Sequence, residues 1–307
     1  MKVAVTGGTG YVGPAVVKEM LADGHEVVVL EHRRPVPIPD HPRLRRVKGD
    51  VRDRASLERA FAGCDAVAHL VAILREAPRR GVTFQSVHVE GTRNVIEAAK
   101  AAGARRLLLM TANDVERRDT PYFETKWRME EMAKASGLDW TIFRPSFVSG
   151  TREPGGDGKA ASRGTDESFD ETFAGIVDKA PVLPSFGGGR FEIQPVSRRN
   201  VAQAFARALS RPQTVAKTYV LVGPERMTWN EYLRRLARLR GKRRPLVWTP
   251  TPVVRAAASA VPGFPATSDQ LKMLVHGSVG DPGPAVRDLD LKLEAWEDAV
   301  AGLRRAR

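Results

Sequence analysis

The feature that most constrains the fold lies at the amino terminus, where a short apolar segment, Lys2–Thr6, runs into three glycines spaced three residues apart. The first, Gly7, allows a tight turn after a strand; Gly10 lets backbone N–H groups approach a phosphate closely; Gly13 lets the next helix pack against the strand. The free N–H groups and the positive dipole end at the start of that helix then face the phosphates. The pattern predicts a dinucleotide-binding turn.

The first half of the chain alternates apolar strands with helices. Strands are predicted over 2–6, 25–30, 45–48, 66–70, 105–111 and 140–145. Helices are predicted over 14–22, 55–62, 84–102 and 121–136, the last with Thr120 as its N-cap and Pro121 at its first position. Apolar strands separated by helices indicate a parallel sheet covered on both faces, so we predict an α/β fold with a doubly wound parallel sheet.

The composition changes after residue 150. Residues 151–195 are rich in Gly, Pro, Ser and Asp, which is typical of loops, and are followed by predicted helices near 199–209, 228–240 and 285–303 and a strand at 218–221. We therefore predict a dinucleotide-binding domain over 1–150 and a smaller mixed C-terminal region over 151–307. Part of this second region is expected to pack back on the first, and the rest to form a substrate or partner surface.

The charge distribution indicates an anionic partner. The 307 residues carry a formal net charge of +13, and seven of the eleven residues between Arg234 and Arg244 are basic. This segment is either a docking site for an acidic protein or a membrane surface, or a solvated basic face; we expect no nucleic-acid partner.

Other sequence features exclude whole classes of protein. The single cysteine, Cys64, excludes an internal disulfide framework, and the six histidines show no ligand spacing, so no metal site is expected. No apolar run reaches the length of a membrane-spanning helix, and no signal peptide is recognisable. We expect a cytoplasmic protein, peripheral to a membrane complex if it docks there.

Two signals at the end of the second strand bear on the identity of the dinucleotide. Glu31 lies 18 residues after Gly13, where a carboxylate accepts hydrogen bonds from the adenosine ribose and repels a 2′-phosphate, which favours NAD. Arg33 and Arg34 follow and can bind that phosphate, which favours NADP. The cofactor is therefore expected to be NAD or NADP, with NAD preferred.

The glycine spacing G-x-x-G-x-x-G over 7–13 resembles the short-chain dehydrogenase/reductase superfamily, particularly its extended and atypical branches. Segments 50–51, 69–73 and 144–146 resemble stretches that line the cofactor there, and segment 91–94 resembles the characteristic middle of the helix that follows the fourth strand. Segments 89–92 and 194–196 are similar to the atypical branch that includes the nucleotide-binding accessory subunit of respiratory complex I and its bacterial relatives. Together the motif, the charges and the resemblance predict these cofactor-binding residues: Gly7, Thr9, Gly10, Tyr11, Val12, Gly13, Glu31, Arg33, Arg34, Asp50, Val51, Leu70, Val71, Ala72, Lys126 and Pro145.

A candidate reactive pair follows the fifth predicted strand. Tyr122 and Lys126 are four apart at the start of a predicted helix and so share one face. The ammonium is expected to lower the pKa of the tyrosine, which can then act as a general acid or base. This is the role that the superfamily pattern Y-x-x-x-K implies for Tyr122 and Lys126, with Thr111 in place of the usual serine as donor to the substrate oxygen. His88 is expected to be a hydrogen-bonded helix histidine rather than a catalyst.

Three functions remain open on the sequence. The first is an NAD(P)-dependent oxidoreductase or epimerase that acts on a small carbonyl or sugar-like substrate. The second is a non-catalytic cofactor-binding accessory or assembly subunit, and the third is a redox-sensing regulator. The chain lacks a G-x-S-x-G elbow and a P-loop, which disfavours hydrolase and phosphoryl-transfer chemistry. A homodimer through the helices near 84–102 and 121–136 is a further expectation.

Overall fold

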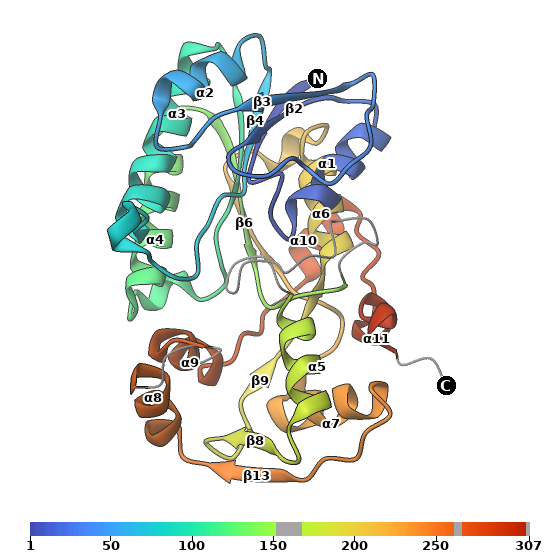
Figure 1. Cartoon of the computed structure of the whole chain (residues 1–307). Coiled ribbons are helices and arrows are strands. Elements are labelled where there is room, and N and C mark those ends of the chain that lie inside the picture. Colours follow the sequence, from blue (N-terminus) through green and yellow to red (C-terminus); the bar gives the residue numbers. More distant parts are fainter. Residues whose placement is uncertain (152–167, 261–265, 305–307) are drawn as a thin grey trace.

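A computed structural model describes residues 1–151, 168–260 and 266–304 (Figure 1). Its centre is a seven-stranded sheet in which all neighbouring strands run parallel. In spatial order the strands are β11 (Lys217–Leu221), β6 (Asp139–Pro145), β5 (Arg106–Met110), β4 (Ala66–His69), β1 (Lys2–Thr6), β2 (Glu26–Glu31) and β3 (Leu44–Lys48). The predicted doubly wound α/β fold is confirmed.

Helices cover both faces of this sheet (Figure 1). One face carries α1 (Gly13–Ala22), α6 (Arg198–Ala208) and α10 (Gly283–Leu289), and the other α2 (Arg54–Phe61), α3 (Gly91–Ala101) and α4 (Pro121–Lys134). Two apolar cores result, one on each face, because strand side chains alternate between them: Val3 and Val5 lie in one core and Ala4 in the other. Burial on both faces explains the continuous apolar runs of the strands.

The strand order reverses between β1 and β4, which are neighbours in the sheet but not in the chain. In sheets of this kind the crevice outside the carboxyl ends at such a switch point is where ligands bind. The glycine turn follows β1, and the segment that begins at Leu70 follows β4, so both predicted cofactor segments lie at this crevice.

The region after residue 150 is divided between two places. Strand β11 and helix α6 belong to the central sheet and its covering layer, with Leu221 paired to Pro145 of β6. The remainder surrounds a third apolar core that includes Trp229, Tyr232 and Trp296. It comprises the helices α5 (Phe169–Lys179), α7 (Trp229–Leu239), α8 (Thr251–Ala260), α9 (Ser268–Val275) and α11 (Trp296–Ala299). Its paired strands are β9 (Glu192–Ile193) with β12 (Met227–Thr228), and β8 (Leu183–Phe186) with β13 (Leu246–Thr249). A further pair, β7 (Val148–Ser149) with β10 (Val196–Ser197), packs against the first core through Val148 and Val196.

Two predicted helices differ in the structure. The single helix predicted over 285–303 is broken after α10, because Asp290 adopts a left-handed conformation with φ of 53° that no helix can continue through. The helix predicted over 84–102 begins as a π-helix, Gln85–Glu90, and becomes α3 at Gly91. By contrast, α4 begins as predicted: the Thr120 hydroxyl accepts a hydrogen bond from the Phe123 N–H, and Pro121 occupies the first helical position.

Candidate cofactor and active site

The turn after β1 leaves no room for side chains at two of its glycines. A Cβ on Gly13 would lie 2.2 Å from the Gly7 carbonyl oxygen, and one on Gly7 would lie 2.9 Å from the backbone of Leu70 and Val71. Gly7 also has a φ of +80°, which favours glycine. The glycine turn therefore packs tightly against helix α1 and against the segment after β4. At Gly10, by contrast, a Cβ would meet nothing closer than 3.4 Å. This open side, at the start of α1, fits a pyrophosphate held by backbone N–H groups.

The other residues of the turn are tied to the C-terminal region. The Tyr11 hydroxyl donates to the Gly150 carbonyl at 2.9 Å, and the Arg198 guanidinium lies 5.3 Å from the centre of its ring. Val12 is buried, and Thr9 is half-buried on the same turn. Of the segment after β4, Leu70 is buried and Val71 and Ala72 are half-buried.

Glu31 lies at the end of β2 as predicted, but its carboxylate is already occupied. The side chain is buried; Oε1 accepts the Val36 N–H at 2.9 Å and Oε2 pairs with Lys48 Nζ at 3.0 Å. Arg46 Nε lies a further 3.6 Å from Oε1. The expectation that this carboxylate faces a ribose is therefore not supported. Arg33 and Arg34 are both exposed on the loop that follows β2.

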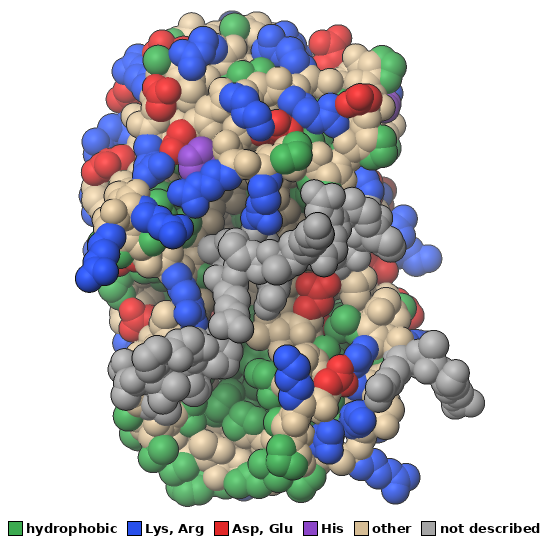
Figure 2. Space-filling view, in the orientation of Figure 1, with side chains coloured by type: hydrophobic (Ala, Val, Ile, Leu, Met, Phe, Trp, Pro, Cys, Tyr) green, Lys and Arg blue, Asp and Glu red, His purple; other side chains and the backbone are tan. Residues whose placement is uncertain are grey.

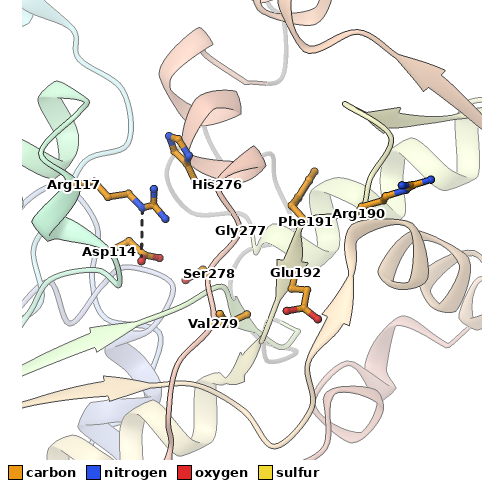
Figure 3. A pocket seen from close by; sticks show the side chains of 9 residues that line it. All are labelled: Asp114, Arg117, Arg190, Phe191, Glu192, His276, Gly277, Ser278 and Val279. Carbon is orange, nitrogen blue, oxygen red and sulfur yellow. Dashed lines mark ion pairs between the residues drawn. The ribbon is translucent and has the colours of Figure 1, made fainter.

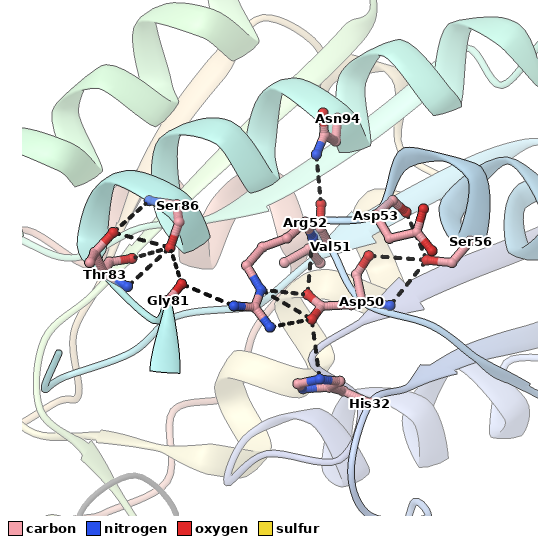
Figure 4. A network of polar contacts seen from close by, with 10 residues as sticks. All are labelled: His32, Asp50, Val51, Arg52, Asp53, Ser56, Gly81, Thr83, Ser86 and Asn94. Atoms are coloured by element: carbon pink, nitrogen blue, oxygen red, sulfur yellow. Dashed lines mark hydrogen bonds and ion pairs between the residues drawn. The ribbon is translucent and has the colours of Figure 1, made fainter. Parts of the chain in front are cut away.

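Asp50, predicted to lie beside the adenine, is the centre of a polar network (Figure 4). Its carboxylate accepts from the Arg52 guanidinium at 2.6 Å and pairs with His32 Nε2 at 3.1 Å. Burial favours the neutral acid, but the hydrogen bonds from Arg52 and the nearby His32 hold the pKa of Asp50 below its ordinary value. The Val51 carbonyl accepts from the Asn94 amide at 3.0 Å, which fastens this loop to α3.

Tyr122 and Lys126 lie together on α4, close to the carboxyl ends of β4 and β5. The Tyr122 ring packs against Phe84, His88 and Phe123, with ring centres 5.6–5.9 Å apart. Its hydroxyl has no hydrogen-bond partner within the described residues. It is not, however, one of the fully solvent-inaccessible side-chain atoms that lack a partner. Lys126 is fully buried behind it; its Nζ lies 6.0 Å from the ring centre and donates to the Met110 carbonyl at 3.2 Å.

Burial shifts both members of this pair away from their charged forms. The pKa of Tyr122 is raised to about 12, so the expected lowering by the ammonium is wrong for this structure. The pKa of Lys126 is lowered to about 7 by burial, against the opposing charge of Glu130. At neutral pH Tyr122 therefore carries its proton, and Lys126 is close to its midpoint.

Thr111 does not face the crevice. Its hydroxyl is buried and donates to Glu130 Oε1 at 2.7 Å. Glu130 in turn accepts a two-pronged contact from Arg144, with Nε at 2.8 Å and Nη2 at 2.6 Å. The predicted role of Thr111 as donor to a substrate oxygen stays a prediction; in this structure its hydroxyl is held by the buried Glu130–Arg144 ion pair. The next residue, Ala112, packs beside Tyr122 and has no hydroxyl to replace it. Pro145, at the end of β6, accepts the Asn113 N–H through its carbonyl oxygen at 3.0 Å.

Two buried histidines lie beside Lys126. His88 Nε2 accepts the Ile73 N–H at 3.0 Å, so Nδ1 carries the proton and faces the Thr125 hydroxyl at 3.0 Å. His69 lies between the hydroxyls of Thr6 and Thr92, at 2.6 and 3.1 Å. Burial and the Lys126 charge lower the pKa of His88 to about 2 and that of His69 to about 3. The expectation of a hydrogen-bonded helix histidine holds for His88.

A pocket of about 420 Å³ lies between the segment that follows β5 and the loop that follows α9 (Figure 3). Its lining residues are Asp114, Arg117, Arg190, Phe191, Glu192, His276, Gly277, Ser278 and Val279. The volume is within the range of small-molecule sites. Asp114 directly precedes Val115, which packs on Tyr122, and His276 follows Met273 of the same cluster by three residues. Tyr122 is not itself a lining residue, but the pocket and the apolar cluster around Tyr122 draw on the same two segments of the chain; the pocket lining carries charges of both signs.

Sequence reasoning missed these pocket residues. Asp114 and His276 are more than 150 residues apart, and only the packing of α9 and its following loop against α4 brings them together. Contacts such as Asn113 Nδ2 to Ser278 Oγ at 3.0 Å hold the two segments in place. Asp114 and Arg118 both have positive φ, which marks backbone strain in this segment. That strain could not be recognised from the sequence.

The chain belongs to the NAD(P)H-binding family, whose model matches residues 7–174. It is thus an NAD(P)-binding protein of the short-chain dehydrogenase/reductase type, and the dinucleotide that fits the glycine turn is NAD or NADP. The matched range includes the glycine turn, the segment after β4 and helix α4.

Three relatives illustrate the range of this family. A 3-beta-hydroxysteroid dehydrogenase of Mycolicibacterium neoaurum is 38% identical over 37% of this chain and 32% of its own. A ceramide reductase of Caulobacter vibrioides is 27% identical over 84% of this chain and 77% of its own. The mitochondrial 40 kDa subunit of NADH-ubiquinone oxidoreductase from Neurospora crassa is 23% identical over 91% and 72%. The matched region spans only about a quarter to a third of the length of the first relatives, the steroid dehydrogenase among them.

Solved structures share the fold. A UDP-glucose 4-epimerase from Thermotoga maritima, determined with UDP-glucose, superposes with a TM-score of 0.72 at 19% identity, over 97% of this chain and 96% of the other. In the described part of the chain, no helix is long and apolar enough to cross a bilayer. Within the same residues, no group of three or more His, Cys, Asp or Glu side chains is arranged to hold a metal ion.

Proposed function

We propose that this protein is an NAD(P)-dependent oxidoreductase or epimerase in which Tyr122 exchanges a proton with the oxygen of a small carbonyl or sugar-like substrate. The observation that carries the proposal is the Tyr122 hydroxyl. It has no hydrogen-bond partner within the described residues, and the Nζ of the buried Lys126 lies 6.0 Å from the centre of its ring.

The residues divide the work as follows. The nicotinamide ring of the dinucleotide supplies or accepts a hydride. Tyr122 carries its proton at neutral pH, so it acts first as a donor to a carbonyl oxygen. Lys126 contributes positive charge 6.0 Å from the ring, which favours the phenolate left after the proton is given up. The mixed charges of Arg117, Arg190 and Glu192 suit a polar substrate.

The proposal predicts that Tyr122→Phe abolishes turnover without loss of cofactor binding. Purified protein is loaded with NADH or NADPH and offered 4-nitrobenzaldehyde, and separately loaded with NAD⁺ or NADP⁺ and offered UDP-glucose, with product followed by chromatography. A loss of about 100-fold or more in kcat is expected, with the dissociation constant of the dinucleotide unchanged. Tyr219→Phe is the matched control, since it removes a buried tyrosine hydroxyl that donates to Asp288 far from the crevice. Equal turnover by wild type and Tyr122→Phe contradicts the proposed role.

We further propose that the cofactor is NADP rather than NAD. The supporting observation is that Glu31 is neutralised by Lys48 and held by the Val36 N–H, whereas Arg33 and Arg34 are exposed beyond it. The double variant Arg33→Ala/Arg34→Ala is expected to weaken NADPH binding by about tenfold or more, as loss of a charge-assisted phosphate contact does. NADH binding should change little; a similar loss for both cofactors counts against this selection.

A second function, that of a non-catalytic accessory subunit, is favoured by one specific observation. Thr111 is turned inward and Ala112 has no hydroxyl, so the side of Tyr122 that faces β5 lacks the expected second donor. The Neurospora crassa relative is itself a subunit of a larger enzyme. A dinucleotide that co-purifies, resists exchange with added NADH or NADPH and raises the melting temperature would support this function over the catalytic one.

A further inference from the structure

The most exposed large apolar side chains of the C-terminal region gather at its far end. Trp248 is 66% exposed, Val253 59%, Val247 47% and Val182 41%. All lie on or directly beside β8, β13 and the start of α8. Figure 1 places β13 at the foot of the molecule, the end farthest from α2, and Figure 2 shows hydrophobic side chains collected there. These four residues are called the apolar tip.

The apolar tip projects because of how its strands pair. Within the described residues, strand β13 pairs only with β8, in parallel, with Val247 opposite Pro184 and Trp248 opposite Ser185. Val247 and Trp248 are adjacent, so their side chains point to opposite faces of the strand, and both are exposed. At the root, Leu183 and Phe186 of β8 are buried in the third core. Leu246 also packs partly against this core, so the ribbon is covered at its root and exposes Val247 and Trp248 on opposite sides of its outer part. Exposed apolar side chains gathered in this way indicate a binding surface.

The chain around the apolar tip is strongly basic. No Asp or Glu occurs between Glu231 and Asp269, a stretch that contains eight Arg and Lys residues. Some of these are used within the fold: Arg235 pairs with Glu225, Arg240 with Asp178, and Arg244 donates to the Val177 carbonyl. Arg234, Arg238 and Arg243 remain exposed. In the basic segment predicted for docking, Arg234 to Arg244, fewer side chains are therefore exposed than the sequence indicates.

We propose that the apolar tip and its exposed arginines dock this protein on the surface of an anionic lipid bilayer. Tryptophan is the side chain best suited to the boundary between headgroups and hydrocarbon, and basic residues nearby add attraction to anionic headgroups. An acidic protein would satisfy the arginines, but two opposite apolar faces of one projecting ribbon fit a soft interface that surrounds them. This inference concerns a surface remote from Tyr122 and does not depend on the proposed reaction.

The test is flotation of the full-length protein with vesicles. Binding is expected with phosphatidylcholine vesicles rich in phosphatidylglycerol and not with phosphatidylcholine alone, and should weaken as salt is raised. Trp248→Ser should lower the partition coefficient about tenfold, and Arg238→Gln/Arg243→Gln about 25-fold, at about fivefold per charge. Trp248→Phe should still bind but lose the blue shift of tryptophan fluorescence that the wild type shows on binding.

A matched control removes the same charge elsewhere. Arg59 on α2 and Arg105 before β5 are exposed at the opposite end of the molecule, so Arg59→Gln/Arg105→Gln should bind vesicles like the wild type. Equal loss in this control would show non-specific attraction and overturn the proposal. Binding that depends on the arginines but not on Trp248 would also overturn it and point to an acidic protein. A dimer that dissociates on Trp248→Ser, with no vesicle binding, would instead assign the apolar tip to a second copy of the chain.

Discussion

The cofactor end of the site and its reactive end are held together by different kinds of interaction. At the cofactor end, the glycine turn is fixed by backbone packing, with Gly13 in contact with Gly7 and Gly7 in contact with the segment after β4. At the reactive end, Lys126, Glu130 and Arg144 are buried and positioned by charge and hydrogen bonds. The first should therefore be sensitive to added atoms, and the second to removed charges and to pH.

The largest effect is expected from breaking the buried ion pair. Glu130→Gln leaves the Arg144 guanidinium with only one strong hydrogen-bond acceptor on that side and should reduce the free energy of unfolding by about 4 kcal/mol. Chemical denaturation measures it. Glu58→Gln, which removes an exposed partner of Arg54, is the control and should cost about 0.5 kcal/mol or less. A small loss at Glu130 would mean that the reactive end does not depend on this pair.

A methyl group at the glycine turn should have the next largest effect. Gly13→Ala places a carbon 2.2 Å from a backbone oxygen that cannot move away, so a loss of about 3 kcal/mol is expected. Gly10→Ala has no such clash; its stability should stay within about 1 kcal/mol of the wild type. Its dinucleotide affinity should nevertheless fall about tenfold, because the methyl occupies the side where the phosphates approach. Unchanged affinity in Gly10→Ala would contradict the placement of the pyrophosphate.

Substitutions of Thr111 separate a structural from a catalytic role. Thr111→Val removes the hydrogen bond to Glu130 and should cost about 2 kcal/mol of stability, the value for a bond to a charged group. Thr111→Ser keeps the bond and should be nearly as stable as the wild type. If turnover exists, the folded Val variant should retain it within about threefold, whereas a much larger loss of kcat would support the role that the sequence predicted.

The smallest effect is a pH dependence at the reactive end. The pKa of His88 falls to about 2 in the folded protein, far below its ordinary value near 6.5, so the folded state binds fewer protons in between. Stability is then fully present above pH 6.5 and is lost as the pH falls, by about 1.4 kcal/mol per pH unit for each such histidine. Unfolding measured between pH 7 and 5 should show a shallower slope in His88→Asn than in the wild type. Equal slopes would mean that His88 is not held neutral.

The cofactor end of the site could be predicted from the sequence more fully than the reactive end, because the two ends are held by different kinds of interaction. The turn at Gly7, Gly10 and Gly13 could be predicted because adjacent residues impose the constraint, and the alternation of strands and helices gave the sheet. The strand at 218–221 was predicted, but its place in the central sheet and the break at Asp290 were not, because sheet membership and a left-handed residue depend on distant packing. The pair Tyr122 and Lys126 could be located, but its electrostatics could not, since burial reverses the shift that neighbouring charges alone predict.

By itself, the sequence determined the doubly wound fold, the dinucleotide-binding turn and the position of α4, since each is encoded by residues close together in the chain. Only the tertiary structure decided which way the polar side chains face. It turned Glu31 toward Lys48, turned Thr111 toward Glu130, and joined Asp114 and His276 in one pocket. The physical reason is that a buried polar group must find a partner wherever the fold provides one, and that partner is rarely a neighbour in the sequence.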